Sequence, residues 1–238
     1  MRLLLAALFA AAGLHAAELI VAAASDLAPL ASQIEKAFQK STGDKVRFTF
    51  ASSGSLARQI ENGAPYDVFL SANDKYVSDL AAAGRIEKAS VVIYAQGRIA
   101  LWSPSSTVRS LEDLARPDVK HIAIPNPQHA PYGVAARKAL ENRGAWKAVE
   151  PKIVYGENVR QALQFAESGN ADAVITSWTL LIGKGALLPQ EWHAPIRQAA
   201  GIVEASGQKA AAARFLKFLT SPEGRAILQA GGLFPSGS

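Results

Sequence analysis

An alternation of strand and helix patterns, interrupted once and then resumed, restricts the fold of this chain more than any other feature. Over residues 18–84, three short apolar segments alternate with three segments that carry apolar residues at helical spacing. A long apolar stretch at 91–102 follows, and the alternation restarts over 121–176. Strands joined by helices pair in parallel, so the pattern predicts α/β layers with helices on both faces of a mostly parallel sheet.

The interruption indicates two lobes. Residues 91–102 are too long for an ordinary strand, so we expect a strand that leaves one lobe and enters the other, with a second crossing strand returning at 195–204. The predicted fold is therefore α/β, with two lobes, each a mostly parallel sheet flanked by helices, joined by two crossing strands. The expected segments are a signal peptide at 1–17, lobe 1 at 18–98 plus 197–238, and lobe 2 at 99–196.

The N-terminus has the pattern of a secretory signal peptide. A single Arg2 precedes an apolar run and the small residues Ala16 and Ala17. The run is shorter than the roughly 20 residues that a membrane-spanning helix needs. We expect cleavage after Ala16 or Ala17 and a soluble, exported mature protein.

Composition argues against several classes of function. The formal net charge of +5 is spread along the chain without a basic run, so a nucleic-acid surface is not expected. The absence of cysteine excludes disulfides, lipidation at cysteine and thiolate metal sites. The four histidines do not have metal-ligand spacing.

Four strand-to-helix turns carry hydrogen-bond donors. They begin at Ser25-Asp26, Ser52-Ser53, Pro131-Tyr132 and Asn158-Val159. Helix N-termini offer unpaired N–H groups and a positive dipole end, and in parallel sheets they meet outside the carboxyl ends of the strands. Each turn alone is explained by helix capping. Together, on both lobes, they predict an anion site without naming the anion.

Two prolines modify this expectation. Pro131 has no N–H, so the donors of its helix begin at Tyr132. Pro29 cannot supply an intrahelical N–H, so we expect its helix to begin one or two residues after Asp26, leaving Ser25 and Asp26 as pre-helical donors.

Enzymatic alternatives have little support. Ser53 precedes Gly54 but has no glycine two positions before it, so it is not in a nucleophile elbow. SSGS is not followed by the lysine of a P-loop. A hydrolase using Ser53 stays an alternative that a neighbouring histidine would favour. A ligand-sensing regulatory domain of the same fold is another.

At these motifs the sequence resembles the periplasmic molybdate-binding proteins of ABC importers, which are type II periplasmic solute-binding proteins. The resemblance covers nearly all of the mature chain. Its motifs are AAASDL at 22–27, FASSGSLARQIENGAPYDVFLSAN at 50–73, IAIPNPQHAPYGVAARKAL at 122–140, ENVRQAL at 157–163 and LKFLTSPEGRAIL at 216–228. The segment ARQIENGAPYDVFLSA is the most specific to the family.

The resemblance implies a ligand, molybdate or tungstate, rather than a cofactor or a catalytic residue, with molybdenum bound only as its oxyanion. Ser25 and Ser53 would donate through hydroxyl and backbone, and Asp26, Tyr132 and Val159 through backbone N–H. It also implies a periplasmic, monomeric protein whose partners are an inner-membrane permease and its ATPase.

The sequence departs from the family pattern at two places, and one question stays open. Some relatives place a capping tyrosine where this chain has Ser177, so Ser177 is only a possible ligand residue, as is Ser52. The Asp26 carboxylate would repel a dianion, and we predict that it points away. Sulfate, chromate or a small organic anion remain alternative ligands for the same fold.

Overall fold

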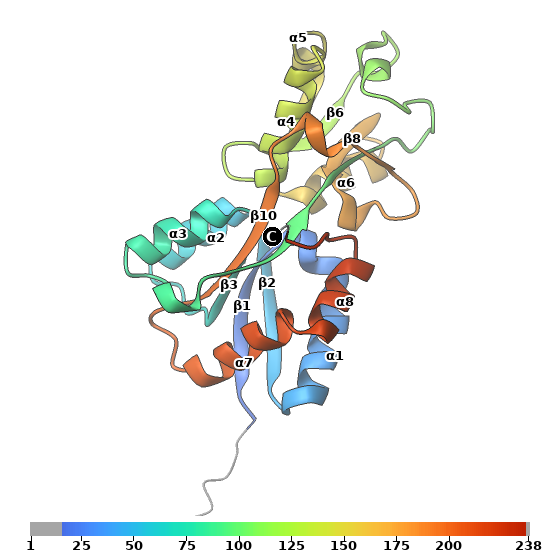
Figure 1. Cartoon of the computed structure of the whole chain (residues 1–238). Helices are drawn as coiled ribbons and strands as arrows, with labels where there is room; N and C mark the ends of the chain where they lie inside the picture. The colour runs from blue at the N-terminus through green and yellow to red at the C-terminus, as the bar shows by residue number, and fades with distance from the viewer. Residues whose placement is uncertain (1–15, 237–238) are drawn as a thin grey trace, which may run out of the picture.

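The computed structural model describes residues 16–236, so the predicted signal peptide at 1–17 lies almost wholly outside the described residues. Figure 1 shows two groups of elements, one above the other, joined by strands that run between them. Within 16–236, the helices are all too short or too polar to cross a membrane.

The first lobe contains a five-stranded sheet in the order β2-β1-β3-β10-β4. β1, β2 and β3 pair in parallel, whereas β10 and β4 join antiparallel. The strands are β1 Glu18–Ala24, β2 Lys45–Ala51, β3 Val68–Ser71, β4 Val92–Gly97 and β10 Ile196–Ile202.

The second lobe repeats this arrangement in the order β7-β6-β8-β5-β9. Again three strands, β6, β7 and β8, pair in parallel, and β5 and β9 join through antiparallel pairs. The strands are β5 Ile99–Trp102, β6 Ile122–Pro125, β7 Ile153–Gly156, β8 Ala173–Ser177 and β9 Ala186–Leu187.

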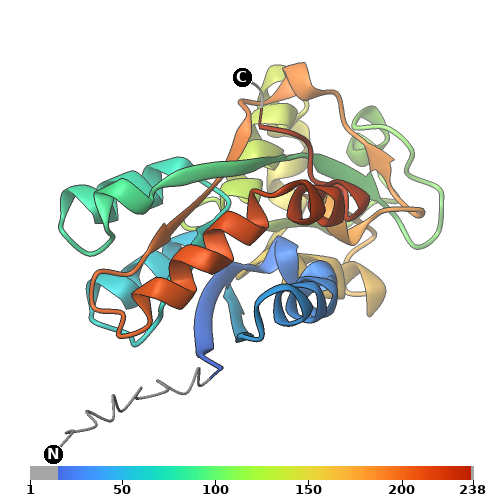
Figure 2. The same cartoon turned by 60° about the horizontal axis from the view of Figure 1, so that its bottom comes forward.

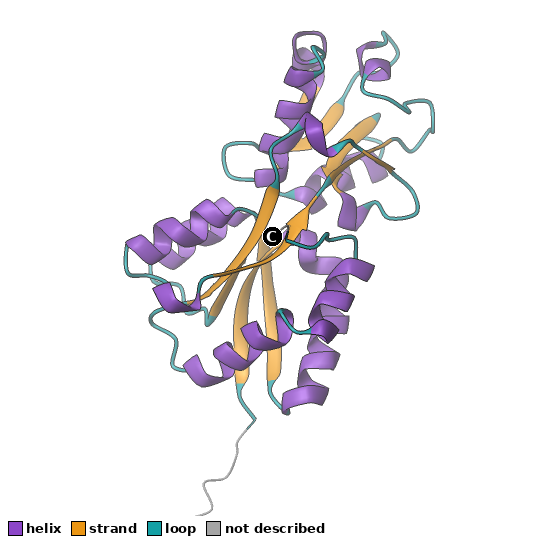
Figure 3. Cartoon of the chain, in the orientation of Figure 1, coloured by secondary structure: helices purple, strands orange, loops and turns teal. Residues whose placement is uncertain are grey.

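The predicted fold class is confirmed: two lobes of α/β layers are joined by two crossing segments. The long apolar stretch divides into β4 and β5, with only Arg98 between them, and β10 makes the return. Each sheet is mixed rather than mostly parallel, because one crossing strand, β10 in the first lobe and β5 in the second, runs opposite to the three parallel strands. Figure 3 shows the strands of the first lobe extending toward the second.

Helices cover both faces of the sheets. In the first lobe, α1, α7 and α8 cover one face and α2 and α3 the other (Figures 1 and 2). The α-helices are α1 Ala31–Thr42, α2 Ser53–Glu61, α3 Asp74–Ala82, α4 Pro131–Asn142, α5 Trp146–Val149, α6 Val159–Glu167, α7 Lys209–Leu219 and α8 Pro222–Ala230. Short 3-10 helices lie at η1 Ser25–Leu30, η2 Lys88–Ser90, η3 Glu112–Ala115, η4 Glu150–Lys152, η5 Trp178–Leu180 and η6 Gln190–Trp192.

The core follows the alternation of β1. Leu19 and Val21 face the cluster under α1, α7 and α8, while Ala22 faces the cluster under α2 and α3. Phe38 is fully buried, and its ring centroid lies 5.1 Å from that of Phe215 in an edge-to-face contact. This aromatic pair packs α1 against α7 on one face of the first sheet.

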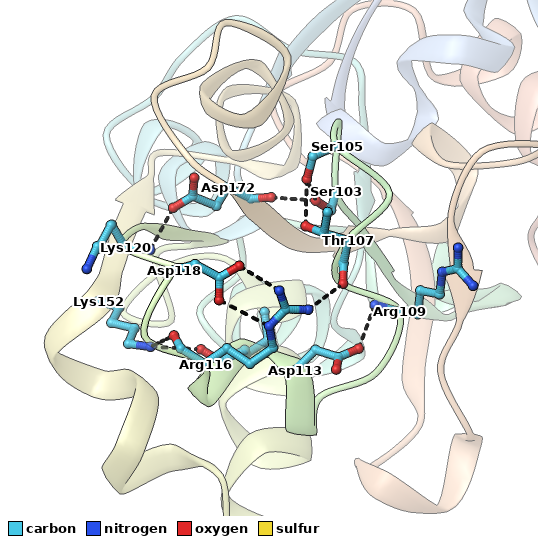
Figure 4. Close-up of polar contacts among 11 residues, drawn as sticks. Ser103, Ser105, Thr107, Arg109, Asp113, Arg116, Asp118, Lys120, Lys152 and Asp172 are labelled. Atoms are coloured by element: carbon cyan, nitrogen blue, oxygen red, sulfur yellow. Dashed lines mark hydrogen bonds and ion pairs between the residues drawn. The ribbon is translucent and has the colours of Figure 1, made fainter.

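Polar contacts stabilise the loop that connects β5 to β6 (Figure 4). The Arg116 guanidinium donates to Asp118 and, at 2.9 Å, to the carbonyl of Thr107. Lys152 donates to the carbonyl of Arg116 at 2.7 Å. These bonds fix backbone carbonyls of a loop that has little regular structure of its own.

The start of η1 corrects the expectation from Pro29. The 3-10 helix begins at Ser25 and α1 begins only at Ala31, so Ser25 and Asp26 lie inside a helical turn rather than before it. Pro29 has no N–H for the carbonyl of Asp26, three residues earlier. The hydroxyl of Thr179, from the second lobe, donates to that carbonyl at 2.7 Å instead.

We expect Phe38→Ala to lower the free energy of unfolding by about 3–5 kcal/mol, because it removes a buried ring and leaves a cavity between α1 and α7. Urea unfolding of the ligand-free protein measures this loss. Val91→Ala, at a position 37% exposed, is the control and should change stability by less than about 0.5 kcal/mol. A loss below about 1 kcal/mol for Phe38→Ala would contradict the central place of this contact.

Candidate anion-binding site

A small cavity lies between the lobes, at the carboxyl ends of β1, β2, β3, β6 and β7. It contains about 200 Å³ of space not filled by protein atoms, part of which is open to solvent. Its lining residues are Ala24, Ser25, Asp26, Ala51, Ser52, Ser53, Ala72, Ala130, Pro131, Tyr132, Asn158 and Val159. The structure therefore brings six of the seven residues singled out from the sequence to one place, and leaves Ser177 outside the lining.

In the first lobe, α2 leaves one backbone donor free. The Ser55 N–H donates to the side chain of Ser52, and the Gly54 N–H donates to the carbonyl of His129. The first-turn N–H groups of a helix have no intrahelical acceptor. Among the described residues, the N–H of Ser53 has no hydrogen-bond partner.

The second lobe repeats this pattern at α6. The Asn158 side chain accepts from the N–H groups of Arg160 and Gln161, at 2.9 and 3.2 Å. The cap thus uses the neighbouring donors, and the N–H of Val159 has no partner within 16–236.

Helix α4 follows the same logic. Pro131 has no N–H, and the N–H groups of Gly133 and Val134 both donate to the carbonyl of Ala130. Only the N–H of Tyr132 remains without a partner in the described part of the chain. Three helices from two lobes therefore each contribute a single unpaired N–H, and each belongs to a residue that lines the cavity.

Two hydroxyl groups add to these donors. The Ser53 Oγ accepts from the N–H of Ala72 at 2.9 Å, which leaves its own hydrogen free to donate. The Ser25 Oγ is buried and has no partner within residues 16–236. A buried hydroxyl without a partner costs about 1–3 kcal/mol, which an acceptor in the cavity would offset.

The Asp26 carboxylate is buried beside these donors. Its Oδ2 accepts from the Tyr132 hydroxyl and from Nε2 of Gln198, both at 2.8 Å. Gln198 belongs to the crossing strand β10 and does not line the cavity. Oδ2 is thus held by the crossing strand, whereas Oδ1 has no partner among the described residues. That the carboxylate as a whole points away from a ligand stays a prediction.

The protonation of this group depends on its surroundings. Burial raises the pKa of Asp26 from its ordinary value of 3.8 to about 6, against the opposing effect of the bonds from Tyr132 and Gln198. Burial and the nearby Asp26 also raise the pKa of Tyr132 well above 10, so its hydroxyl keeps its proton and donates.

Ser177 and Ser52 have other partners. Ser177 is fully buried, and its hydroxyl lies 2.9 Å from that of Thr179. Ser52 caps α2 and lies 2.9 Å from Nδ1 of His129. The histidine that would favour a hydrolase therefore contacts Ser52, whose hydroxyl is engaged in capping, and no bond joins it to Ser53 among the described hydrogen bonds.

Three residues that make contacts in this region were not predicted from the sequence. Gln198 is a buried polar residue within the apolar crossing strand, which is a signal that sequence reading can detect. His129 precedes a helix start that was already singled out. Thr179 has no comparable signal, because its contact depends on how the lobes meet. Within 16–236, no group of three or more His, Asp or Glu side chains is placed to hold a metal ion.

Comparisons with known proteins agree with this architecture. The family described as bacterial extracellular solute-binding protein matches residues 19–234. The molybdate-binding protein ModA of Rhodobacter capsulatus is 35% identical over 228 residues, covering 94% of this chain and 89% of that protein. The solved periplasmic molybdate-binding protein of Azotobacter vinelandii has a TM-score of 0.87 at 33% identity, over 92% of this chain and all of that one. The sulfate-binding protein SubI of Mycobacterium tuberculosis shares the fold, with a TM-score of 0.77 at 17% identity over 92% of this chain and 87% of that one.

We expect the stability of the wild type, relative to Asp26→Asn, to fall as pH rises from 4 to 7.5. Between pH 3.8 and about 6 the folded chain binds more protons than the unfolded chain, so the contribution of Asp26 is complete below 3.8 and is lost as pH rises through about 6. The relative loss should approach about 3 kcal/mol.

Urea unfolding at each pH measures this difference. Asparagine keeps an acceptor for Tyr132 and Gln198 but does not ionise, so it isolates the charge from the hydrogen bonds. Parallel stability curves for the two proteins would show that Asp26 does not titrate in this range.

Proposed function

Because the chain belongs to the family of bacterial extracellular solute-binding proteins, together with the molybdate-binding proteins of R. capsulatus and A. vinelandii, we propose that it captures molybdate or tungstate between its lobes. The captured anion is cargo for an ABC importer, not a cofactor, and the protein is a carrier without a catalytic role. We place it in the periplasm, as a soluble monomer that delivers the anion to an inner-membrane permease and its ATPase.

The observation that carries this proposal is the chemistry of the cavity lining. Three unpaired N–H groups, on Ser53, Tyr132 and Val159, and the hydroxyls of Ser25 and Ser53 are all donors. No Lys or Arg belongs to the described lining. Such a site suits a fully deprotonated tetrahedral oxyanion, which offers only acceptors. Helix dipoles and hydrogen bonds would then balance its charge.

The same chemistry disfavours protonated phosphate. A phosphate that carries a proton needs an acceptor, and the donors of this lining leave that proton without one unless Oδ1 of Asp26 faces it. Molybdate and sulfate differ in size rather than in hydrogen-bonding pattern, so the volume of the closed cavity decides between them.

An open groove offers the anion a route to this site. It adjoins the cavity through two shared lining residues, Ser25 and Asn158, and continues past Arg160 on α6. Arg160 is exposed, so its charge attracts anions toward the groove without entering the site itself.

Calorimetric titration of the purified, dialysed mature protein with molybdate, tungstate, sulfate and phosphate tests the proposal. We expect 1:1 binding of molybdate and tungstate, with sulfate and phosphate much weaker. Preferential binding of sulfate would indicate that the protein is a sulfate carrier that uses the same site. No heat with any of the four anions would refute the oxyanion assignment.

We expect Ser25→Ala and Ser53→Ala each to weaken molybdate binding by about 10- to 150-fold, since each removes a hydrogen bond to a charged ligand worth about 1.5–3 kcal/mol. The same titration measures the loss. Ser78→Ala is the matched control, because Ser78 is exposed on α3 and its hydroxyl bonds only the carbonyl of Lys75. Wild-type affinity in both site variants would place the anion elsewhere.

A further inference from the structure

His129 joins the two lobes through two separate hydrogen bonds. It lies in the loop between β6 and α4 of the second lobe and is only 8% exposed. Its carbonyl accepts from the N–H of Gly54 at 2.9 Å, and its Nδ1 lies 2.9 Å from the hydroxyl of Ser52. Ser52 and Gly54 both belong to the first lobe.

These bonds join two helix starts that carry donors for the anion. Ser52 directly precedes Ser53, and His129 lies three residues before Tyr132. The contact therefore fixes the distance between donors that come from different lobes. Gly54 makes this approach possible, since a Cβ atom there would lie 2.9 Å from the carbonyl oxygen of His129.

The two ring nitrogens of His129 face different lobes. The Ser52 hydroxyl donates to that of Ser55 at 2.8 Å, so Nδ1–H of His129 is the donor to the Ser52 oxygen. The other ring nitrogen, Nε2, lies 3.4 Å from a carboxylate oxygen of Glu157 in the second lobe, whose side chain is 71% exposed. The exposed Glu157 contributes little energy of its own.

The contact is separate from the hinge. Asp26 accepts bonds from Tyr132 and Thr179 of the second lobe, and Gln198 of the crossing strand β10 donates to Tyr132. The bonds of His129 involve no residue of a crossing strand. They can break when the lobes part without any change within the strands that connect them.

We propose that His129 is a positioning residue that holds the lobes closed over the bound anion and so sets the rate at which the anion leaves. The inference rests on the proposed function, because it assumes that the lobes part to release the ligand. Bonds made only in the closed form slow dissociation and leave association unchanged.

The test compares His129→Ala with His129→Asn in the full mature protein. Molybdate-loaded protein is mixed with excess tungstate, and the molybdenum that stays bound is measured over time. We expect His129→Ala to release molybdate about 3- to 10-fold faster, as the loss of one neutral hydrogen bond implies, with an unchanged association rate. Asparagine offers an amide N–H near the position of Nδ1 and should restore much of the wild-type rate.

His121→Ala is the matched control, since His121 is an exposed histidine of the same lobe outside the cavity lining. A wild-type release rate in His129→Ala would overturn the proposal. So would a lowered melting temperature with slower association and no rescue by asparagine, which would indicate a purely structural role.

Hydrogen exchange of the Gly54 amide separates this inference from the proposed function. That amide is protected only while the His129 carbonyl accepts its hydrogen bond. If the wild type binds none of the four anions, the proposed function fails, but faster exchange in His129→Ala than in the wild type would still support the closing role. Equal exchange in the two proteins would refute it.

Discussion

The structure depends on what happens to backbone N–H groups at the start of each helix. A helix cannot pair its first N–H groups, so every strand-to-helix turn either caps them or leaves them exposed. Here the caps Ser52 and Asn158 accept from neighbouring N–H groups, and within residues 16–236 the N–H groups of Ser53 and Val159 have no partner. The parallel strands then bring these free donors to one edge of each sheet, and the two crossing segments bring the edges together.

Much of this could be read from the sequence, because it follows from local patterns. The alternation of apolar segments predicted strands and helices from residue 18, where β1 begins, and Pro131 indicated that the donors of α4 begin at Tyr132. The crossing strands followed from a stretch that was too long for one ordinary strand, although the single crossing strand predicted there is divided at Arg98. The mixed direction of the sheets did not, because residue pattern alone carries no strand direction.

The contacts between the lobes could not be predicted from the sequence. Tyr132 donates to the Asp26 carboxylate across 106 residues of the chain, and Thr179 donates to the carbonyl of Asp26 across 153. No periodicity links positions so far apart. Ser177 illustrates the converse: alignment to relatives singled it out, yet its hydroxyl pairs with Thr179 outside the cavity lining. Residues that act within one turn are predictable, whereas residues that act across the cleft need the assembled fold.

Pro29 has a consequence that reaches beyond its own helix. In η1 it has no N–H to donate to the carbonyl of Asp26, and the Thr179 hydroxyl of the second lobe donates to that carbonyl. The turn is thereby less stable on its own than a regular one. The hydrogen bond to the Asp26 carbonyl forms only when the lobes meet. The Pro29 ring thus moves part of the free energy of local folding into the free energy of domain association.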